Sequence, residues 1–102
     1  MLDDKQKSNM AESAEKAEKL LKLLANKYRL QILCSLASSE KNAGELEEES
    51  DLSQSAISQH LAKLRESDVV IAQKRGQMVY YKLASIEVNA ILSTLYLIYC
   101  NK

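Results

Sequence analysis

The spacing of apolar positions between Asp51 and Arg65 predicts the best-defined element of the chain. Ile57, Leu61 and Leu64 recur at four- and three-residue intervals, which is the spacing of one buried helix face. Ser53 stands just before this stripe, where its hydroxyl can cap the first turn of a helix. The pattern therefore predicts a helix that begins after Ser53 and packs inward through these three side chains.

The opposite face of this predicted helix carries mostly neutral hydrogen-bonding side chains. The residues that turn away from the stripe, or stand in the exposed first turn, are Gln54, Ser55, Ser58, Gln59, Ala62 and Lys63. Surface helices usually show Glu and Lys, whereas the donors and acceptors of Gln and Ser suit base edges in the major groove of DNA. This pattern alone fits a DNA-reading helix and a plain surface helix equally well, so the neighbouring segments must decide.

A shorter helix is predicted immediately upstream, with a tight turn between the two. Asn42 and Glu45 have the spacing of a capping box, which starts a helix that buries Leu46 and ends near Ser50. Residues 50–52 then form a connector of the length found in a helix-turn-helix. The pair of helices is therefore typical of a DNA-binding motif.

A β-hairpin is predicted downstream of this motif. Two runs rich in β-branched and aromatic residues cover positions 69–74 and 77–83. They flank Arg75 and Gly76, and Gly76 can supply the positive φ that a tight hairpin turn requires. A hairpin in this place is the wing of a winged helix-turn-helix.

An amphipathic first helix is predicted from Asn9 to Ala25. Asn9 and Glu12 have capping-box spacing, and a heptad-like apolar seam follows them. The seam consists of Met10, Ala14, Ala17, Leu21 and Leu24. Residues 1–8 are polar, and we expect them to form a frayed, disordered tail.

Two further helices complete the prediction. Asn26 is expected to cap a helix over 27–38, with Cys34 among its buried residues. The last helix is expected to begin after Ser85 and to run to about Tyr99. Its apolar residues cover too wide an arc for one supporting contact, so it needs a second partner. The simplest one is the same helix, together with the first helix, of another subunit in a two-fold homodimer.

Taken together, these elements predict one domain over 1–102 that is mainly α with a small β-hairpin. The order α-α-α-α-β-β-α is that of a winged helix-turn-helix, with dimerisation helices at both ends. A chain of 102 residues with no proline fits this fold but buries a thin core alone, so dimerisation would help it. We see no transmembrane-length apolar run and no signal peptide, and therefore expect a cytoplasmic protein without a membrane partner.

Charge is distributed unevenly along the chain, although the net charge is zero. A zero net charge argues against a polycation that simply coats nucleic acid. Acidic residues gather between Glu45 and Asp51, which we interpret as a solvated helix face. The basic residues of the DNA-reading helix and the wing are Lys63, Arg65, Lys74, Arg75 and Lys82. This distribution favours phosphate contacts from the helix and wing.

Four strings of sequence, in matching order and spacing, resemble the ArsR/SmtB family of winged-helix repressors. They read LANKYRLQIL at 24–33, AGEL at 43–46, LSQSAISQHLAKLR at 52–65 and VYYKL at 79–83. The resemblance extends over nearly all of 20–100. Within the family, the chain is most similar to the BigR, HlyU and SqrR branch of persulfide-responsive repressors.

The candidate chemistry lies in Cys34 and Cys100. On the residues alone, a free cysteine is often a small core hydrophobe, and these two match no compact metal or redox motif. In the persulfide-responsive branch, one cysteine lies on the second helix and its partner lies near the end of the last. Cys34 and Cys100 occupy those places, so the resemblance implies that they form a redox-sensing pair with reactive sulfur species as the inducer.

Metal and enzyme chemistry are less well supported. The segment Gly44–Asp51 contains no cysteine and the last helix no histidine, so neither a soft-ligand nor a zinc-type site is expected. We assign the single histidine, His60, a hydrogen bond to backbone or phosphate. Cys34 has apolar neighbours, unlike a catalytic thiol. We expect no metal, no cofactor and no enzymatic activity, and the alternative is a metal(loid)-sensing or non-sensing winged-helix protein with structural cysteines.

The sequence thus predicts a homodimeric repressor that binds an inverted-repeat DNA operator while its thiols are reduced. Reactive sulfur would release it by linking Cys34 to Cys100. The residues predicted to contact DNA are Ser53, Gln54, Ser55, Ser58, Gln59, His60, Lys63, Arg65, Lys74 and Arg75. Their basic members should set the salt dependence of binding, and the Gln and Ser side chains should read bases.

Overall fold

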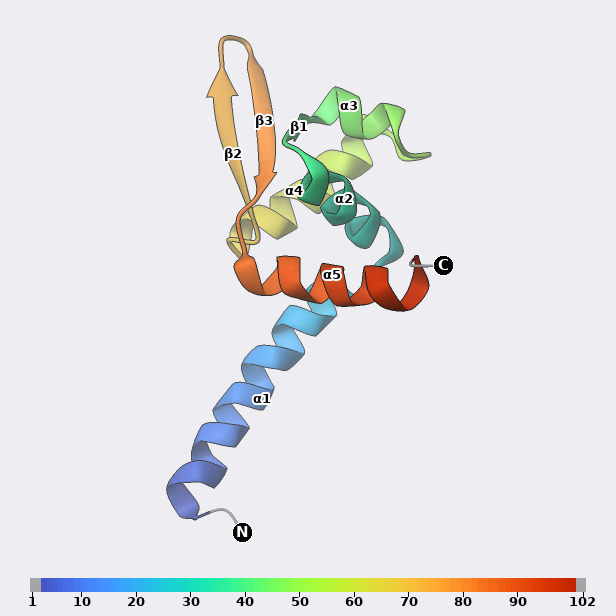
Figure 1. Ribbon diagram of the computed structural model, residues 1–102. Coiled ribbons are helices and arrows are strands. Elements are labelled where there is room, and N and C mark those ends of the chain that lie inside the picture. Colours follow the sequence, from blue (N-terminus) through green and yellow to red (C-terminus); the bar gives the residue numbers. More distant parts are fainter. Residues whose placement is uncertain (1–2, 101–102) are drawn as a thin grey trace.

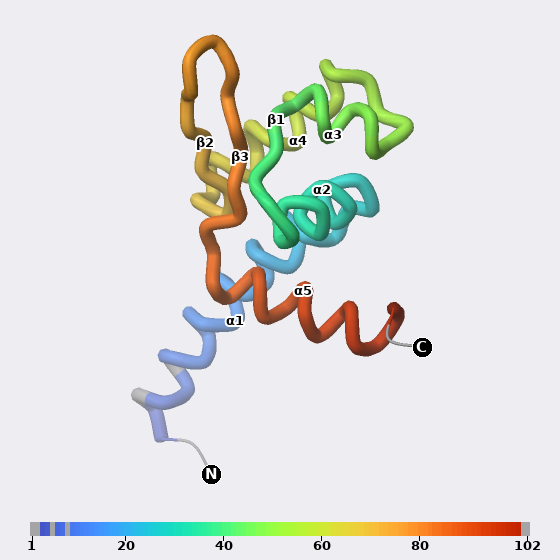
Figure 2. The backbone as a smooth tube through the Cα atoms, turned by 45° about the horizontal axis from the view of Figure 1, so that its top comes forward, coloured from blue at the N-terminus to red at the C-terminus, as the bar shows by residue number. Residues whose placement is uncertain are grey.

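The computed structural model describes residues 3–100, which form five helices and one three-stranded antiparallel sheet (Figure 1). In chain order the elements are α1 (Asp4–Leu24), α2 (Lys27–Ser38), β1 (Lys41–Asn42), α3 (Ala43–Glu48), α4 (Gln54–Glu66), β2 (Val70–Arg75), β3 (Met78–Leu83) and α5 (Ile86–Tyr99). The molecule measures 54 × 35 × 20 Å, and it is elongated because α1 projects away from the other elements (Figure 2).

An apolar core forms where α2, α3 and α4 meet the base of the sheet and α5. The most deeply buried side chains, with less than 2% exposure, are Leu33, Leu46, Ile57, Leu61, Leu64, Val70 and Val88. Three of them are the stripe predicted for α4, so the predicted orientation of that helix is confirmed. Among the described residues no polar side chain is buried with them, so apolar contact alone holds the core together.

Side-chain caps fix the starts of the two helices of the motif. Asn42 accepts a hydrogen bond from the Glu45 amide at 2.8 Å, and the Glu45 carboxylate accepts one from the Asn42 amide at 3.0 Å. The Ser53 hydroxyl accepts from the Ala56 amide at 3.2 Å at the start of α4. Leu52, between the helices, packs half-buried against the core. The predicted caps and turn of the helix-turn-helix are therefore confirmed.

Asp68 ends the last turn of α4 in the left-handed region, with a φ of 58°. Its amide donates to the Arg65 carbonyl at 3.0 Å, and the Val69 amide donates to the Leu64 carbonyl at 3.0 Å. These two bonds make a Schellman motif, in which glycine usually occupies the left-handed position. The motif turns the chain sharply from α4 into β2.

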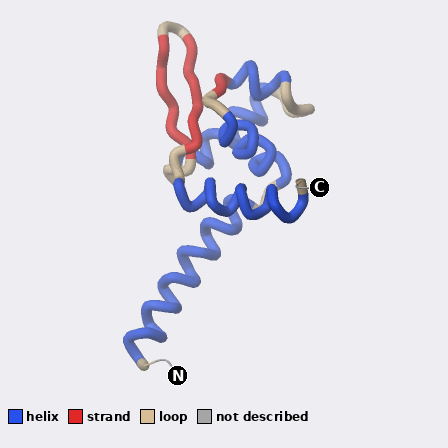
Figure 3. Tube along the Cα trace, in the orientation of Figure 1, coloured by secondary structure: helices blue, strands red, loops and turns tan. Residues whose placement is uncertain are grey.

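The predicted hairpin is formed by β2 and β3, which are the two long strands of Figure 3. Arg75 pairs with Met78 across the turn, and Gly76 adopts a φ of 62°, as predicted. The sequence pattern missed β1, which pairs Lys41 with Tyr81 and Asn42 with Tyr80. A strand of two residues is too short to show alternation. Apart from this strand, the predicted winged helix-turn-helix order is confirmed.

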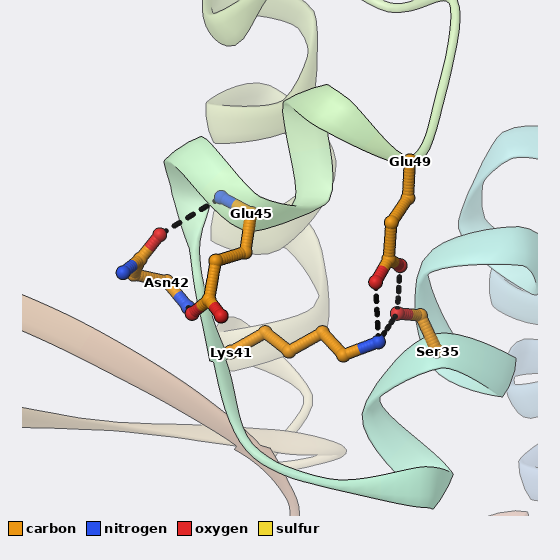
Figure 4. A network of polar contacts seen from close by, with 5 residues as sticks. All are labelled: Ser35, Lys41, Asn42, Glu45 and Glu49. Atoms are coloured by element: carbon orange, nitrogen blue, oxygen red, sulfur yellow. Dashed lines mark hydrogen bonds and ion pairs between the residues drawn. The ribbon is translucent and has the colours of Figure 1, made fainter.

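A polar network ties α2, β1 and the end of α3 together (Figure 4). The Lys41 ammonium lies 2.7 Å from the Ser35 hydroxyl and 2.5 Å from a Glu49 carboxylate oxygen. The Ser35 hydroxyl in turn donates to the other Glu49 oxygen. These hydrogen bonds, first from Lys41 and then from Ser35, lower the pKa of Glu49. The network fastens the first helix of the motif to α2.

Helix α1 begins earlier than predicted. Its N-cap is Asp3, which forms a capping box with Gln6, and Asn9 lies inside the helix and does not cap it. The expectation of a disordered tail over 1–8 is therefore wrong from Asp4 onward. Asp3 and Gln6 have the same capping-box spacing as the predicted pair, so the helix can begin there. Residues 1 and 2 lie outside the described part of the chain. Only the C-terminal end of α1 reaches the core, through Leu20, Leu23 and Leu24.

Helix α5 crosses the base of the fold and begins at its Ser85 cap, as predicted. It buries Val88 and Leu92 but exposes a large apolar surface toward its C-terminal end. Within residues 3–100, none of the helices combines the length and apolar character needed to cross a membrane.

Candidate nucleic-acid interface and thiol pair

The outer face of α4 presents a row of small polar side chains to solvent. Gln54, Ser55, Ser58, Gln59 and Ala62 line one shallow depression on this face. Because the inner face of α4 is locked into the core, the row is held rigidly, as direct reading of a major groove requires. Its predicted placement is confirmed, and its contact with DNA stays a prediction.

His60 lies at the edge of this face and is half-buried. Its ring centroid is 6.2 Å from that of Tyr28 on α2. Burial lowers the pKa of His60, and the charges of Arg29 and Lys63 lower it further. The imidazole is therefore neutral near pH 7 and packs against α2, so it offers a hydrogen bond and not a positive charge. Tyr28 was not singled out from the sequence, because no local pattern pairs it with a helix so distant in the chain.

Lys63 and Arg65 are exposed in the last turn of α4. Cations in this position stabilise a helix because they face the negative end of its dipole. The two residues thus have a structural role beside the phosphate contacts predicted for them.

Lys74 and Arg75 end β2 near the tip of the wing. Both are exposed, but their surroundings differ. The Arg75 guanidinium donates to both carboxylate oxygens of Glu40, with 2.9 Å between Nη2 and Oε2. The Arg75 side chain is thus already paired within its own subunit. Its position in the sequence did not indicate this pairing. Glu40 was missed because an ion pair that spans 35 residues leaves no local signal.

The expectation that Cys34 is buried is wrong. Both cysteines are free and exposed. The buried residues of α2 are Ile32, Leu33 and Leu36, and at about 100° per residue Cys34 falls on the other side of the helix. It lies instead beside α5.

Cys34 lines a groove of about 440 Å³ between α2 and α5. The other residues of this groove are Ala37, Ser38, Asn89, Leu92, Ser93, Tyr96 and Leu97. Cys100 caps the end of α5, where its amide donates to the Tyr96 carbonyl at 2.8 Å. Partial burial raises the pKa of the Cys34 thiol, and the charge of Cys100 raises it further. Cys34 and Cys100 thus lie on the two helices that border this groove.

The described residues contain no group of side chains arranged as a metal site. Between residues 3 and 100, no three His, Cys, Asp or Glu side chains are grouped to hold a metal ion. The candidate groups that remain are the polar row of α4 and the exposed thiols of Cys34 and Cys100. A rigid reading helix followed by a basic hairpin defines a winged helix-turn-helix DNA-binding domain.

The chain belongs to the arsR family of bacterial regulatory proteins. The profile of this family, "Bacterial regulatory protein, arsR family", matches residues 26–72. The transcriptional activator HlyU of Vibrio cholerae is 48% identical over 91 residues, which cover 89% of this chain and 84% of that protein. Like its relatives, the chain is a transcriptional regulator and not an enzyme. The family resemblance inferred from the four strings of sequence is confirmed.

Solved structures agree with this assignment. Reduced HlyU from Vibrio cholerae superposes with a TM-score of 0.86 at 48% identity, covering 90% of this chain and 97% of that one. The transcriptional repressor BigR from Xylella fastidiosa gives a TM-score of 0.82 at 32% identity, covering 93% and 94% of the two chains. The two similarities therefore extend over most of the described fold.

Proposed function

We propose that the protein is a homodimeric repressor whose DNA affinity is switched by a sulfur bridge between Cys34 and Cys100. The observation that carries this proposal is the pair of exposed thiols on the two packed helices, with Cys34 in the α2–α5 groove and Cys100 at the end of α5. Cys34 lies on α2, which packs against the reading helix α4, and Cys100 ends α5. A bond between them would restrain two helices that support the DNA-binding motif.

Dimerisation is supported by apolar surface that a lone subunit leaves in water. The C-terminal half of α5 exposes Tyr96, Leu97, Ile98 and Tyr99 to between 61% and 71%. A second apolar groove runs along α1, between Ala14 and Ala25. Continuous exposed apolar surface is rare on monomeric proteins and typical of subunit interfaces. A two-fold dimer would set two copies of α4 about 34 Å apart, in successive major grooves of an inverted repeat.

The chemistry of the switch can be written as two sulfur-transfer steps. The Cys100 thiolate attacks the outer sulfur of a persulfide donor, forms Cys100 persulfide and expels the donor's thiolate. Cys34 is converted in the same way by a second donor. The Cys100 persulfide then attacks the inner sulfur of the Cys34 persulfide, forms a trisulfide and expels hydrosulfide. Attack by a Cys100 thiolate on the same sulfur would give a disulfide instead, with the same leaving group.

The order of attack follows from the surroundings of Cys34. Its raised pKa keeps little thiolate at neutral pH, so Cys34 should take sulfur from its donor slowly, and we assign the attack that closes the bridge to the Cys100 persulfide. The bridge must also favour a conformation with misaligned reading helices. A coupling of about 1 to 3 kcal/mol would lower operator affinity by roughly 5- to 150-fold.

The switch is tested with a duplex selected from a random library by the reduced protein. Fluorescence anisotropy would follow release by glutathione persulfide, and mass spectrometry would identify the crosslink. We expect release of the parent chain, continued binding by Cys34→Ser and Cys100→Ser, and little effect of arsenite or zinc. Release of the double-serine variant by the donor, or a crosslink that leaves affinity unchanged, would refute the switch. A non-sensing regulator would bind equally in all of these conditions.

The reading face is tested separately. Gln59→Ala should cost about 1 to 3 kcal/mol on the selected duplex and much less on a random one. Gln31→Ala, which removes an exposed glutamine from α2, is the matched control. Equal binding by the two variants would show that the outer face of α4 does not read bases.

The sign of regulation needs its own assay, because HlyU is named an activator and BigR a repressor. Transcription from a template that carries the selected site should fall when the reduced protein is added. A rise in transcription would refute repression and leave DNA binding intact.

A further inference from the structure

The guanidinium of Arg75 is occupied by three side chains of its own domain. Both its Nη atoms bond the Glu40 carboxylate, and Nη2 also lies 3.0 Å from the Gln73 side-chain oxygen. The same group stacks over the Tyr80 ring, 5.2 Å from its centroid. Arg75 therefore crosses β3 from the wing to reach the segment before β1.

A phosphate would need the same donors that Glu40 now uses. Arginine binds carboxylate and phosphate with the same forked pair of N–H groups, so the two partners exclude each other. Glu40 is a built-in partner, with its side chain 32% exposed in the pair. Lys74 points to the other face of β2, because neighbouring residues of a strand alternate, and it shares none of these contacts.

We propose that Glu40 competes with DNA phosphate for Arg75 and so lowers the affinity of the wing for DNA. This inference rests on the proposed DNA-binding function and adds a positioning residue to it. With Glu40 in place, the wing gains its arginine contact only when a phosphate displaces the carboxylate. Non-specific binding, which depends on phosphate contacts alone, is thereby weakened.

The competition has a magnitude and a salt dependence. Breaking an exposed ion pair of this kind changes an equilibrium constant by about two- to fivefold. Glu40→Gln should therefore raise the affinity for DNA by about that factor per wing. Two wings of a dimer would give roughly 4- to 25-fold. The gain should shrink between about 50 and 200 mM salt, because screening already weakens the Glu40–Arg75 pair.

The test is a double-mutant cycle on a random-sequence duplex of about 30 base pairs, since phosphate contacts do not depend on sequence. The four proteins are the parent, Glu40→Gln, Arg75→Ala and the double variant, with folding checked by circular dichroism. Glu48→Gln, which removes the same charge from an exposed acid of α3, is the control. We expect a gain from Glu40→Gln that exceeds the control and disappears in the Arg75→Ala background.

Two results would overturn the inference alone. One is a gain no larger than that of Glu48→Gln, and the other is an equal gain in the Arg75→Ala background, which would mean that Glu40 merely repels DNA. If neither the parent nor Glu40→Gln binds any duplex, the proposed function fails and takes this inference with it.

Discussion

Replacing Leu97 and Ile98 together by serine should dissociate the dimer without unfolding the subunit. Both residues are 62% exposed near the end of α5 and lie outside the buried core. Full burial of a Leu or Ile side chain is worth about 1.5 to 3 kcal/mol, so the part still exposed is worth about 1 to 2 kcal/mol. If only one of the two lies in the interface, two subunits lose about 2 to 4 kcal/mol.

A loss of this size raises the dimer dissociation constant by roughly 30- to 1,000-fold. Sedimentation equilibrium would measure it across a range of protein concentrations. Ile71→Ser is the matched control, because Ile71 is 48% exposed on β2 and does not belong to α5. The far-ultraviolet circular dichroism of all variants should show a folded protein.

The argument fails if the parent chain is a monomer at micromolar concentration. It also fails if the α5 variant sediments as the parent does, because the exposed apolar end of α5 would then have another purpose. Loss of operator binding should accompany dissociation, since one subunit keeps half of the contacts.

Two further predictions concern stability. Glu49→Gln should cost less than about 1 kcal/mol near neutral pH, because the Glu49 side chain is 44% exposed and solvent screens its ion pair. A carboxylate whose pKa is lowered by folding stabilises the folded state at pH values above its unfolded pKa. This contribution is lost as the pH falls through the folded pKa. The free energies of unfolding of parent and variant, measured by urea titration, should therefore converge below about pH 4. Asp68→Val should lower stability by about 1 to 2 kcal/mol in thermal melts, whereas Asp68→Gly should not, because only the valine is strained at a positive φ. Equal melting temperatures for the two Asp68 variants would contradict this reasoning.

Local signals made most of the fold predictable. The caps at Asn42, Ser53 and Ser85 and the positive φ of Gly76 depend on residues within a few positions of one another. The side chains that turn outward on α4 follow from helical periodicity alone. The start of α1 was misplaced because two separate stretches, 3–6 and 9–12, have the spacing of a capping box, and the helix begins at the first of them.

The errors at the candidate site share a physical origin, which is contact between distant segments. Cys34 has apolar neighbours in sequence, but burial depends on which side of α2 meets the core. The pairing of Glu40 with Arg75 and of Tyr28 with His60 likewise depends on how separate elements pack. Residue spacing within one helix or hairpin carries no information on such contacts.

The free-standing part of α1 has a consequence for the lifetime of the protein. In a lone subunit, the described part of α1 before Leu20 adds no side chain to the core, and a helix without tertiary contacts is marginal in water. In an unassembled chain, the N-terminal part of α1 would unfold readily and be cleaved by proteases, whereas assembly would bury it. The cellular amount of such a regulator would tend toward the concentration at which its subunits pair. Exposure of α1 would then direct proteolysis to unpaired subunits, which would be degraded before they accumulate.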